Sequence, residues 1–354
     1  MKNFIAGVAV SLGVLTPAVA GTSVKICGST PWSATNAAIA YGISLGFFAE
    51  EGLDPELVAV QGGAIVLPQI ANKKIEFGVV NPDLAIMALA KGEAYPIRFV
   101  YNLYTTQIFE FAVLASSPIK TLADLKGKKV GVGALSWSNL PMSKAMLKDV
   151  GLTWQENVQV LPVGVGPAAW SRLKTGSVDA LNLFGHQHEA MALSGTPIRR
   201  LPLPEKFRPL FSNGIIVHED TIKENPALVE KVGRAIAKST YACSLNYEAC
   251  AKGFWTIEPS SRPTPDKEAA WVAQYAALNK VDINFIQGAQ AKGHSGEYGA
   301  AQWRDIIRIM KDAEQITTSD LPVEKLFTNQ FVRAFNAWDR AAVQKKVVDT
   351  SGSR

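Results

Sequence analysis

The stretch "VAVQGGAIVLPQIANKKIEFGVVN" (58–81) reappears in altered form as "LPVGVGPAAWSRLKTGSVDALNLF" (161–184), and the two align without a gap. Each contains an apolar strand, a Gly-containing turn, an amphipathic helix that ends near Lys or Gly, and a second apolar strand. Another strand precedes each copy, "SVKICGS" (23–29) in the first half and "KKVGVGALS" (128–136) in the second, and a helical pattern follows it. Each half is therefore predicted to be β-α-β-α-β, which requires right-handed crossovers and a mostly parallel sheet.

Two such halves predict an α/β chain of two lobes, each a mostly parallel sheet flanked by helices. Ligands bind at the carboxyl ends of the strands in open α/β sheets, so the expected ligand cleft lies between the lobes. The apolar strand "FEFAVLASS" (109–117) is expected to cross to the second lobe, and "FSNGIIVHED" (211–220) to return. The predicted boundaries are 21–112 and 217–354 for lobe I, and 113–216 for lobe II. Helices are expected in the C-terminal third at 225–246, 266–280, 300–313 and 324–346.

The first residues, "MKNFIAGVAVSLGVLTPAVA" (1–20), are predicted to be a signal peptide. Lys2 precedes an apolar run that is too short to span a membrane, and Ala18-Val19-Ala20 supplies a small-x-small cleavage site. The alternative is a strand or helix of the mature fold. Export to the periplasm is expected on this basis. The formal net charge is +5, and the charges are interspersed along the chain, so no nucleic-acid partner is expected.

Three cysteines are present. Cys243 continues the apolar face of a predicted helix, and a tight turn after it would bring Cys250 back beside it. An exported chain permits oxidation, so a Cys243–Cys250 disulfide is predicted, the alternative being two small buried thiols. Cys27 would then remain unpaired, buried at the end of the first strand.

Three phrases resemble periplasmic substrate-binding proteins of ABC importers: "FAEEGLDPELVAVQGG" (48–63), "SPIKTLADLKGKKVGVG" (117–133) and "LKTGSVDALNL" (173–183). The branch they resemble includes sulfonate, taurine and nitrate binders and binders of thiamine-pyrimidine precursors. The resemblance implies a type II periplasmic-binding-protein fold, a hinged clamp that delivers a small molecule to a membrane permease. It implies a non-enzymatic monomer without a cofactor. An alternative implied by the same superfamily is a thiamine-pyrimidine synthase that consumes its own histidine, and another is a sensor that feeds a receptor.

The ends of the predicted strands supply the candidate ligand-binding residues, because free N–H groups at helix N-termini and close backbone approach at glycines suit a bound ligand. These candidates are Trp32, Gly62, Gly63, Asn81, Asp83, Glu110, Ser136, Trp137, Ser138, Asn139, Gly166, Phe184 and His186.

Several candidates have a structural alternative. Asn81 and Asp83 are suited to capping a helix, and Gly62-Gly63 to a turn. Trp32 could pack beneath its own loop. Glu110, which interrupts an apolar strand, could bind an amine or heterocycle or pair with a local Arg or Lys. Trp137 is expected to cover one face of the ligand when the lobes close.

Two patterns suggest other chemistry and are set aside. His186 and His188 would share one face of an extended segment, but no further metal-ligand motif accompanies them, so His186 is expected to form a hydrogen bond with the ligand. "GVGPAA" (164–169) matches a dinucleotide-binding pattern, but the next strand ends in Phe184 instead of an acidic residue.

The candidate loops contain aromatic, Ser, Asn and His side chains but no Arg or Lys. An anionic ligand such as a sulfonate would have to rely on helix N-termini and N–H groups. Aromatic and neutral polar groups suit a planar nitrogen heterocycle or aromatic compound at least as well, and this class is slightly favoured.

Overall fold

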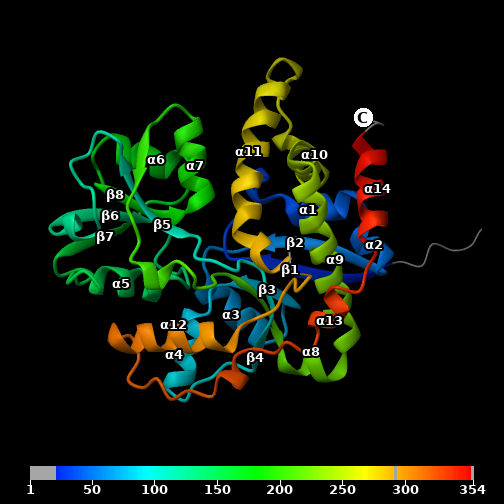
Figure 1. Cartoon of the computed structure of the whole chain (residues 1–354), viewed down its shortest axis with the longest axis horizontal. Helices are drawn as coiled ribbons and strands as arrows, with labels where there is room; N and C mark the ends of the chain where they lie inside the picture. The colour runs from blue at the N-terminus through cyan, green and yellow to red at the C-terminus, as the bar shows by residue number, and fades with distance from the viewer. Residues whose placement is uncertain (1–20, 291–292, 352–354) are drawn as a thin grey trace, which may run out of the picture.

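The computed structural model describes residues 21–290 and 293–351, so the predicted signal peptide lies outside the described residues. Among the described residues the strands form two five-stranded sheets (Figure 1). The first has the order β2-β1-β3-β10-β4, from β1 (Thr22–Gly28), β2 (Leu53–Ala59), β3 (Phe77–Val80), β4 (Ile97–Asn102) and β10 (Gly214–His218). The second has the order β7-β6-β8-β5-β9, from β5 (Phe109–Leu114), β6 (Lys128–Val132), β7 (Val158–Pro162), β8 (Ala180–Phe184) and β9 (Ile198–Arg200).

The two sheets repeat one topology. In the first, β1 pairs in parallel with β2 and β3, while β10 is antiparallel to β3 and β4. In the second, β6 pairs in parallel with β7 and β8, while β5 is antiparallel to β8 and β9. Each sheet therefore has one reversed strand, and this strand comes from the other half of the chain. The predicted α/β class is confirmed, with two mixed sheets.

Helices cover both sheets. Those in the first two thirds of the chain are α1 (Ala38–Ser44), α2 (Phe47–Glu50), α3 (Gly63–Ala71), α4 (Asp83–Ala90), α5 (Leu140–Lys148), α6 (Pro167–Lys174), α7 (Gly185–Leu193) and α8 (Glu219–Glu224). The remaining helices are α9 (Pro226–Leu245), α10 (Tyr247–Gly253), α11 (Pro265–Gln290), α12 (Ala300–Asp312), α13 (Val332–Phe335) and α14 (Arg340–Ser351). None of the helices in the described ranges is long and apolar enough to cross a membrane.

The C-terminal helices connect the two halves. In Figure 1, α11 stands between α7 and α10, and α12 lies beneath α5. Trp303 on α12 anchors that helix to the first sheet, because its ring packs 5.3 Å from the ring of Phe99 on β4 and 5.4 Å from the ring of Phe327. The predicted helix 324–346 is wrong in its extent. Asn336 interrupts it by hydrogen bonding with the backbone of Ser295, and Asp339 accepts the N–H of Ala341 as the next helix begins.

The predicted disulfide is confirmed: Cys243 near the end of α9 is bonded to Cys250 on α10. Asn246 lies between the two helices, and its side chain accepts the N–H of Ala249 at 2.9 Å, which caps α10. Cys27 is a buried free thiol on β1, where burial raises its pKa to about 11.

Candidate functional site

Two cavities lie where the carboxyl ends of the strands meet, and both are lined by the Ser29-Thr30 turn after β1. The first, which we call the Trp137 cavity, has a volume of about 70 Å³. Its other lining residues include Gln61, Gly133, Trp137 and Val165. The second, which we call the Asn213 cavity, has a volume of about 40 Å³. Its other lining residues include Trp32, Asn36, Tyr104, Phe184, His186 and Asn213.

A wall of stacked rings joins the two cavities. The ring of Trp137 stacks on Phe184 at 4.9 Å between centroids, and Phe184 stacks on His186 at 5.3 Å. Phe109 on β5 lies opposite Phe184 on the adjacent strand β8 and supports this wall, with its centroid 4.8 Å from that of Phe184. Trp137 is only 6% exposed, so its indole is both a core side chain and part of a cavity wall.

A hydrogen-bonded acid lies behind the Asn213 cavity. The Tyr104 hydroxyl donates to Asp282 Oδ1 at 2.9 Å, and His186 Nδ1 lies 3.4 Å from the same oxygen. Burial and the neighbouring Asp282 carboxylate raise the pKa of Tyr104 well above its ordinary value, so its hydroxyl stays protonated. Sequence reasoning missed Tyr104 and Asp282. Asp282 had one usable signal, a carboxylate within the apolar stretch "VDINFI" (281–286), which follows the predicted helix 266–280 and lies in the observed α11.

Asn213 is a third site residue that sequence reasoning missed. It precedes β10, it is 7% exposed, and its backbone carbonyl accepts the N–H of Tyr104 at 3.0 Å. Its side-chain oxygen Oδ1 is buried without a hydrogen-bond partner among the residues that the structure describes. A buried acceptor of this kind carries a desolvation cost unless a ligand or water satisfies it.

Trp32 lies at the edge of the same cavity. Its indole Nε1 donates to the carbonyl of Val58 at 2.8 Å, so that group is already satisfied within the first lobe. The ring itself lines the Asn213 cavity and offers an apolar surface. Trp32 therefore packs beneath its loop and faces the cavity at once.

Direct contacts join the loops of the two halves. The N–H of Ala64 donates to the carbonyl of Ser136 at 3.1 Å, and the Ser136 hydroxyl donates to the carbonyl of Gln61. The backbone of the two adjoining glycines is closely packed. A Cβ added at Gly62 would lie 2.4 Å from the Ser136 carbonyl oxygen, and one at Gly63 would lie 2.4 Å from the Ser138 hydroxyl oxygen. These glycines therefore permit one lobe to approach the other.

Asn81 and Asp83 extend this contact. The N–H of Asn81 donates to Ser138 Oγ at 3.0 Å, and the side chain of Asn81 accepts the N–H of Asp83 at 3.2 Å. Asp83 Oδ2 accepts the N–H of Met142 at 2.7 Å, so this residue at the start of α4 caps the N-terminus of α5. Burial raises the pKa of Asp83 to about 8, although the N–H groups of Met142 and Asp83 lower it. Neither residue lines one of the two cavities.

Three other candidates also lie away from both cavities. Asn139 donates to Ser143 Oγ at 3.3 Å inside the second lobe. The N–H of Gly166 donates to Gln187 at 3.0 Å. Glu110 forms an ion pair with Arg200 at 2.8 Å, the local pairing that was one of its two expected roles.

Glu110 also faces His188, and the two groups influence each other. Burial raises the pKa of Glu110, but His188 and Arg200 outweigh this effect and lower it overall. Burial lowers the pKa of His188. The expectation that His186 and His188 share one face of an extended segment is wrong, because both lie on α7 and approach different acids, Asp282 and Glu110. Across residues 21–290 and 293–351, no group of three or more His, Cys, Asp and Glu side chains could hold a metal ion.

Comparison with known proteins gives relatives along most of the chain. A protein of Haemophilus influenzae named as a thiamine biosynthesis protein is 25% identical over 278 residues, covering 77% of this chain and 85% of that protein. A formylaminopyrimidine-binding protein of Halalkalibacterium halodurans is 25% identical over 275 residues, covering 75% of this chain and 77% of that protein.

Among solved structures, the alkanesulfonate-binding protein from Xanthomonas axonopodis pv. citri bound to MOPS superimposes with a TM-score of 0.61 at 16% identity. The match covers 87% of this chain and 99% of that one. It identifies the architecture described above as a periplasmic-binding-protein fold. The family model described as NMT1/THI5 like matches residues 34–247, which is more than half of the chain. The chain therefore belongs to the NMT1/THI5-like family.

Proposed function

We propose that this protein is an extracytoplasmic solute-binding protein that captures a planar nitrogen heterocycle between its two lobes and delivers it to an ABC permease. The ligand occupies the Asn213 cavity and the adjoining Trp137 cavity, which enlarge when the lobes open. The flat face of the ligand packs on the wall of stacked rings, and its edge forms hydrogen bonds with the neutral polar groups. Micromolar affinity needs only about 8 kcal/mol, which a few hydrogen bonds and one or two stacked rings can supply.

The unpaired side-chain oxygen of Asn213 is the observation that carries this proposal. It is a buried acceptor in a cavity whose walls include Trp32, Phe184 and His186. A ring N–H or an exocyclic amino group would satisfy it. Within the described part of the chain neither cavity is lined by Lys or Arg, so a neutral or weakly basic heterocycle meets no opposing charge.

A sulfonate finds less support in these cavities. Without a cationic side chain it would depend on free N–H groups at helix N-termini. The N-terminus of α5 is already occupied, because Asp83 accepts the N–H of Met142 there. The relative named for formylaminopyrimidine binding supports the heterocycle class, and the structural neighbour bound to MOPS represents the competing class.

Closure of the two lobes is the proposed capture step. The contacts of Ser136 and Ser138 with Gln61, Ala64 and Asn81 exist only while the loops lie together, so they favour the closed state. The permease would recognise this closed shape. Residues 1–20 would direct export to the periplasm. The lobes would follow boundaries close to the predicted ones, with all of β5 in the second lobe and all of β10 in the first.

Native mass spectrometry of the purified protein, followed by a thermal-shift panel, tests the proposal. Pyrimidines are expected to raise the melting temperature, whereas sulfonates and aromatic acids of similar size should raise it less when added at the same concentration. Absence of a shift with any pyrimidine would contradict the heterocycle assignment. Turnover, or loss of mass from a histidine during incubation, would instead support the enzyme alternative.

Asn213→Leu provides the matched test of the site. The variant keeps the approximate side-chain size but removes the acceptor, so it should weaken pyrimidine binding about tenfold or more. Asn284→Leu, at an exposed position on α11, is the control and should leave the affinity unchanged. Equal affinities for the two variants would remove Asn213 from the site.

A further inference from the structure

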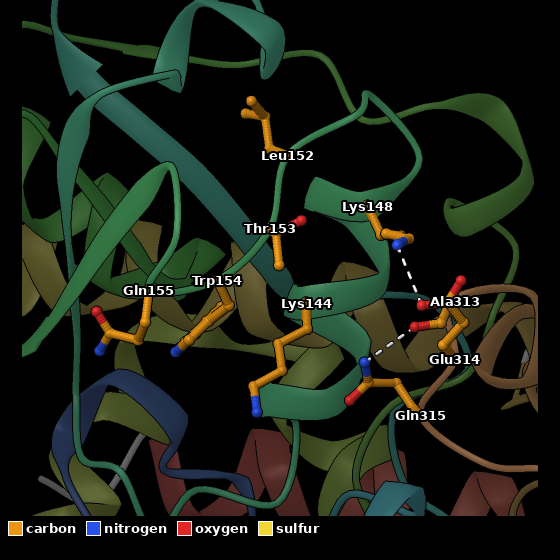
Figure 2. Close-up of a pocket in the computed structure, with 9 residues that line it drawn as sticks. All are labelled: Lys144, Lys148, Leu152, Thr153, Trp154, Gln155, Ala313, Glu314 and Gln315. Carbon is orange, nitrogen blue, oxygen red and sulfur yellow. Dashed lines mark hydrogen bonds and ion pairs between the residues drawn. The ribbon is translucent and has the colours of Figure 1, made fainter.

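A third cavity, of about 380 Å³, lies outside the cleft (Figure 2). It is formed by the C-terminal half of α5, the loop that follows it, and the residues just after α12. Its lining includes Lys144, Lys148, Leu152, Thr153, Trp154 and Glu314. Its volume falls within the range typical of small-molecule sites.

The charge on the walls of this cavity is positive. Lys148 is paired with Glu314 at 3.2 Å, and Figure 2 shows this pair at one side of the cavity. Lys144 has no ion pair with any residue in the described ranges. Its ammonium lies instead over the indole of Trp154, 5.5 Å from the ring centroid. A cation–π contact leaves ammonium N–H groups free to donate to an anion.

The apolar groups of the cavity lie beside this cation. The Trp154 indole is partly exposed, and the small side chain of Ala313 also lines the cavity. An aromatic face beside one uncompensated cation suits a ligand that combines a flat ring with a single negative charge.

We propose that this cavity is a second binding site, for a planar aromatic carboxylate. The ring of the ligand packs on the exposed part of Trp154, and the carboxylate accepts hydrogen bonds from Lys144. The two sites thus differ in charge: the cleft cavities are lined by neutral polar groups, whereas this cavity presents a lysine without an ionic partner. The site lies at the junction of α5 with α12, which is anchored to β4 through Trp303.

Titration calorimetry with three small probes tests this assignment on the full protein. 1-Naphthoate carries both the ring and the charge, 1-naphthylmethanol carries only the ring, and acetate carries only the charge. Saturable binding is expected for 1-naphthoate, with at least tenfold weaker binding of the other two. Equal binding of acetate would indicate a simple anion site, and equal binding of 1-naphthylmethanol an uncharged apolar pocket; either result would overturn the proposal.

Variants locate the binding and distinguish this site from the cleft. Lys144→Gln and Trp154→Leu should each weaken 1-naphthoate binding about tenfold, and Lys144→Arg should retain it. Lys311→Gln, at an exposed lysine on α12 outside the lining, is the matched control and should bind like wild type. Thermal unfolding of each variant verifies the fold. Undiminished binding by Lys144→Gln, or loss of 1-naphthoate binding in Asn213→Leu alone, would place the ligand in the cleft and refute the second site.

Discussion

The acid that caps α5 gives the most quantitative prediction. Asp83 is 1% exposed, and burial raises its pKa to about 8 from an ordinary value of 3.8. Between these two pH values the unfolded chain has lost this proton while the folded chain retains it. The free energy of unfolding therefore falls as pH rises through this window, and it becomes independent of this group above about pH 8.

Asp83→Asn removes the titration but retains an oxygen that can accept the N–H of Met142. The amide cannot ionise, so its stability relative to wild type should rise with pH by about 1.4 kcal/mol per unit, or roughly 2.7 kcal/mol between pH 5 and pH 7. Any constant difference between the carboxyl and the amide cancels in this comparison. Denaturant unfolding followed by tryptophan fluorescence at the two pH values measures it.

Asp124→Asn is the control for this experiment. Asp124 is exposed and accepts the N–H groups of Lys120 and Thr121, which lower its pKa. The contribution of Asp124 to the free energy of unfolding is lost only as pH falls through that lowered pKa. The difference in this free energy between Asp124→Asn and wild type should therefore stay constant between pH 5 and pH 7. Parallel pH profiles for Asp83→Asn and wild type would refute the buried, protonated state of Asp83.

Three further substitutions test the cleft and the Cys243–Cys250 disulfide. Gly63→Ala should weaken ligand binding because its Cβ would lie 2.4 Å from Ser138 Oγ. Adding Ser138→Gly should restore only part of the affinity in the same titration, because it also removes the acceptor of the Asn81 N–H. Trp137→Ala should weaken binding more than tenfold and also lower the free energy of unfolding by about 3 kcal/mol, because the indole is largely buried. Replacing Cys243 and Cys250 by Ser should lower that free energy by about 2–3 kcal/mol, measured by denaturant unfolding without reductant, whereas an unchanged midpoint would show that the disulfide adds no stability.

The fold could be predicted from the sequence because the internal repeat places the same elements at the same spacing in both halves. The aligned stretches 58–81 and 161–184 contain α3 and α6 at matching positions, followed by β3 and β8. The spacing of the apolar residues and the Gly-containing turns determine these elements locally. The C-terminal region was less predictable, since Asn336 ends a helical pattern through a hydrogen bond with Ser295, 41 positions away.

The candidate site was predicted in part. Strand ends identified the loops that meet, and Phe184, His186 and Trp137 do form one wall. Polar residues at these ends proved harder to interpret, because the same side chain can bind a ligand or another loop. Asp83 binds the backbone of α5, a pairing that depends on how the lobes approach each other and has no local signature.

The selectivity proposed for the cleft, a neutral nitrogen heterocycle over an anion, is tested by comparing two ligands on the same protein. Titration calorimetry with formylaminopyrimidine and with MOPS, at equal ionic strength, gives the two dissociation constants. We expect micromolar or tighter binding of formylaminopyrimidine and at least a hundredfold weaker binding of MOPS. Tighter binding of MOPS would contradict it.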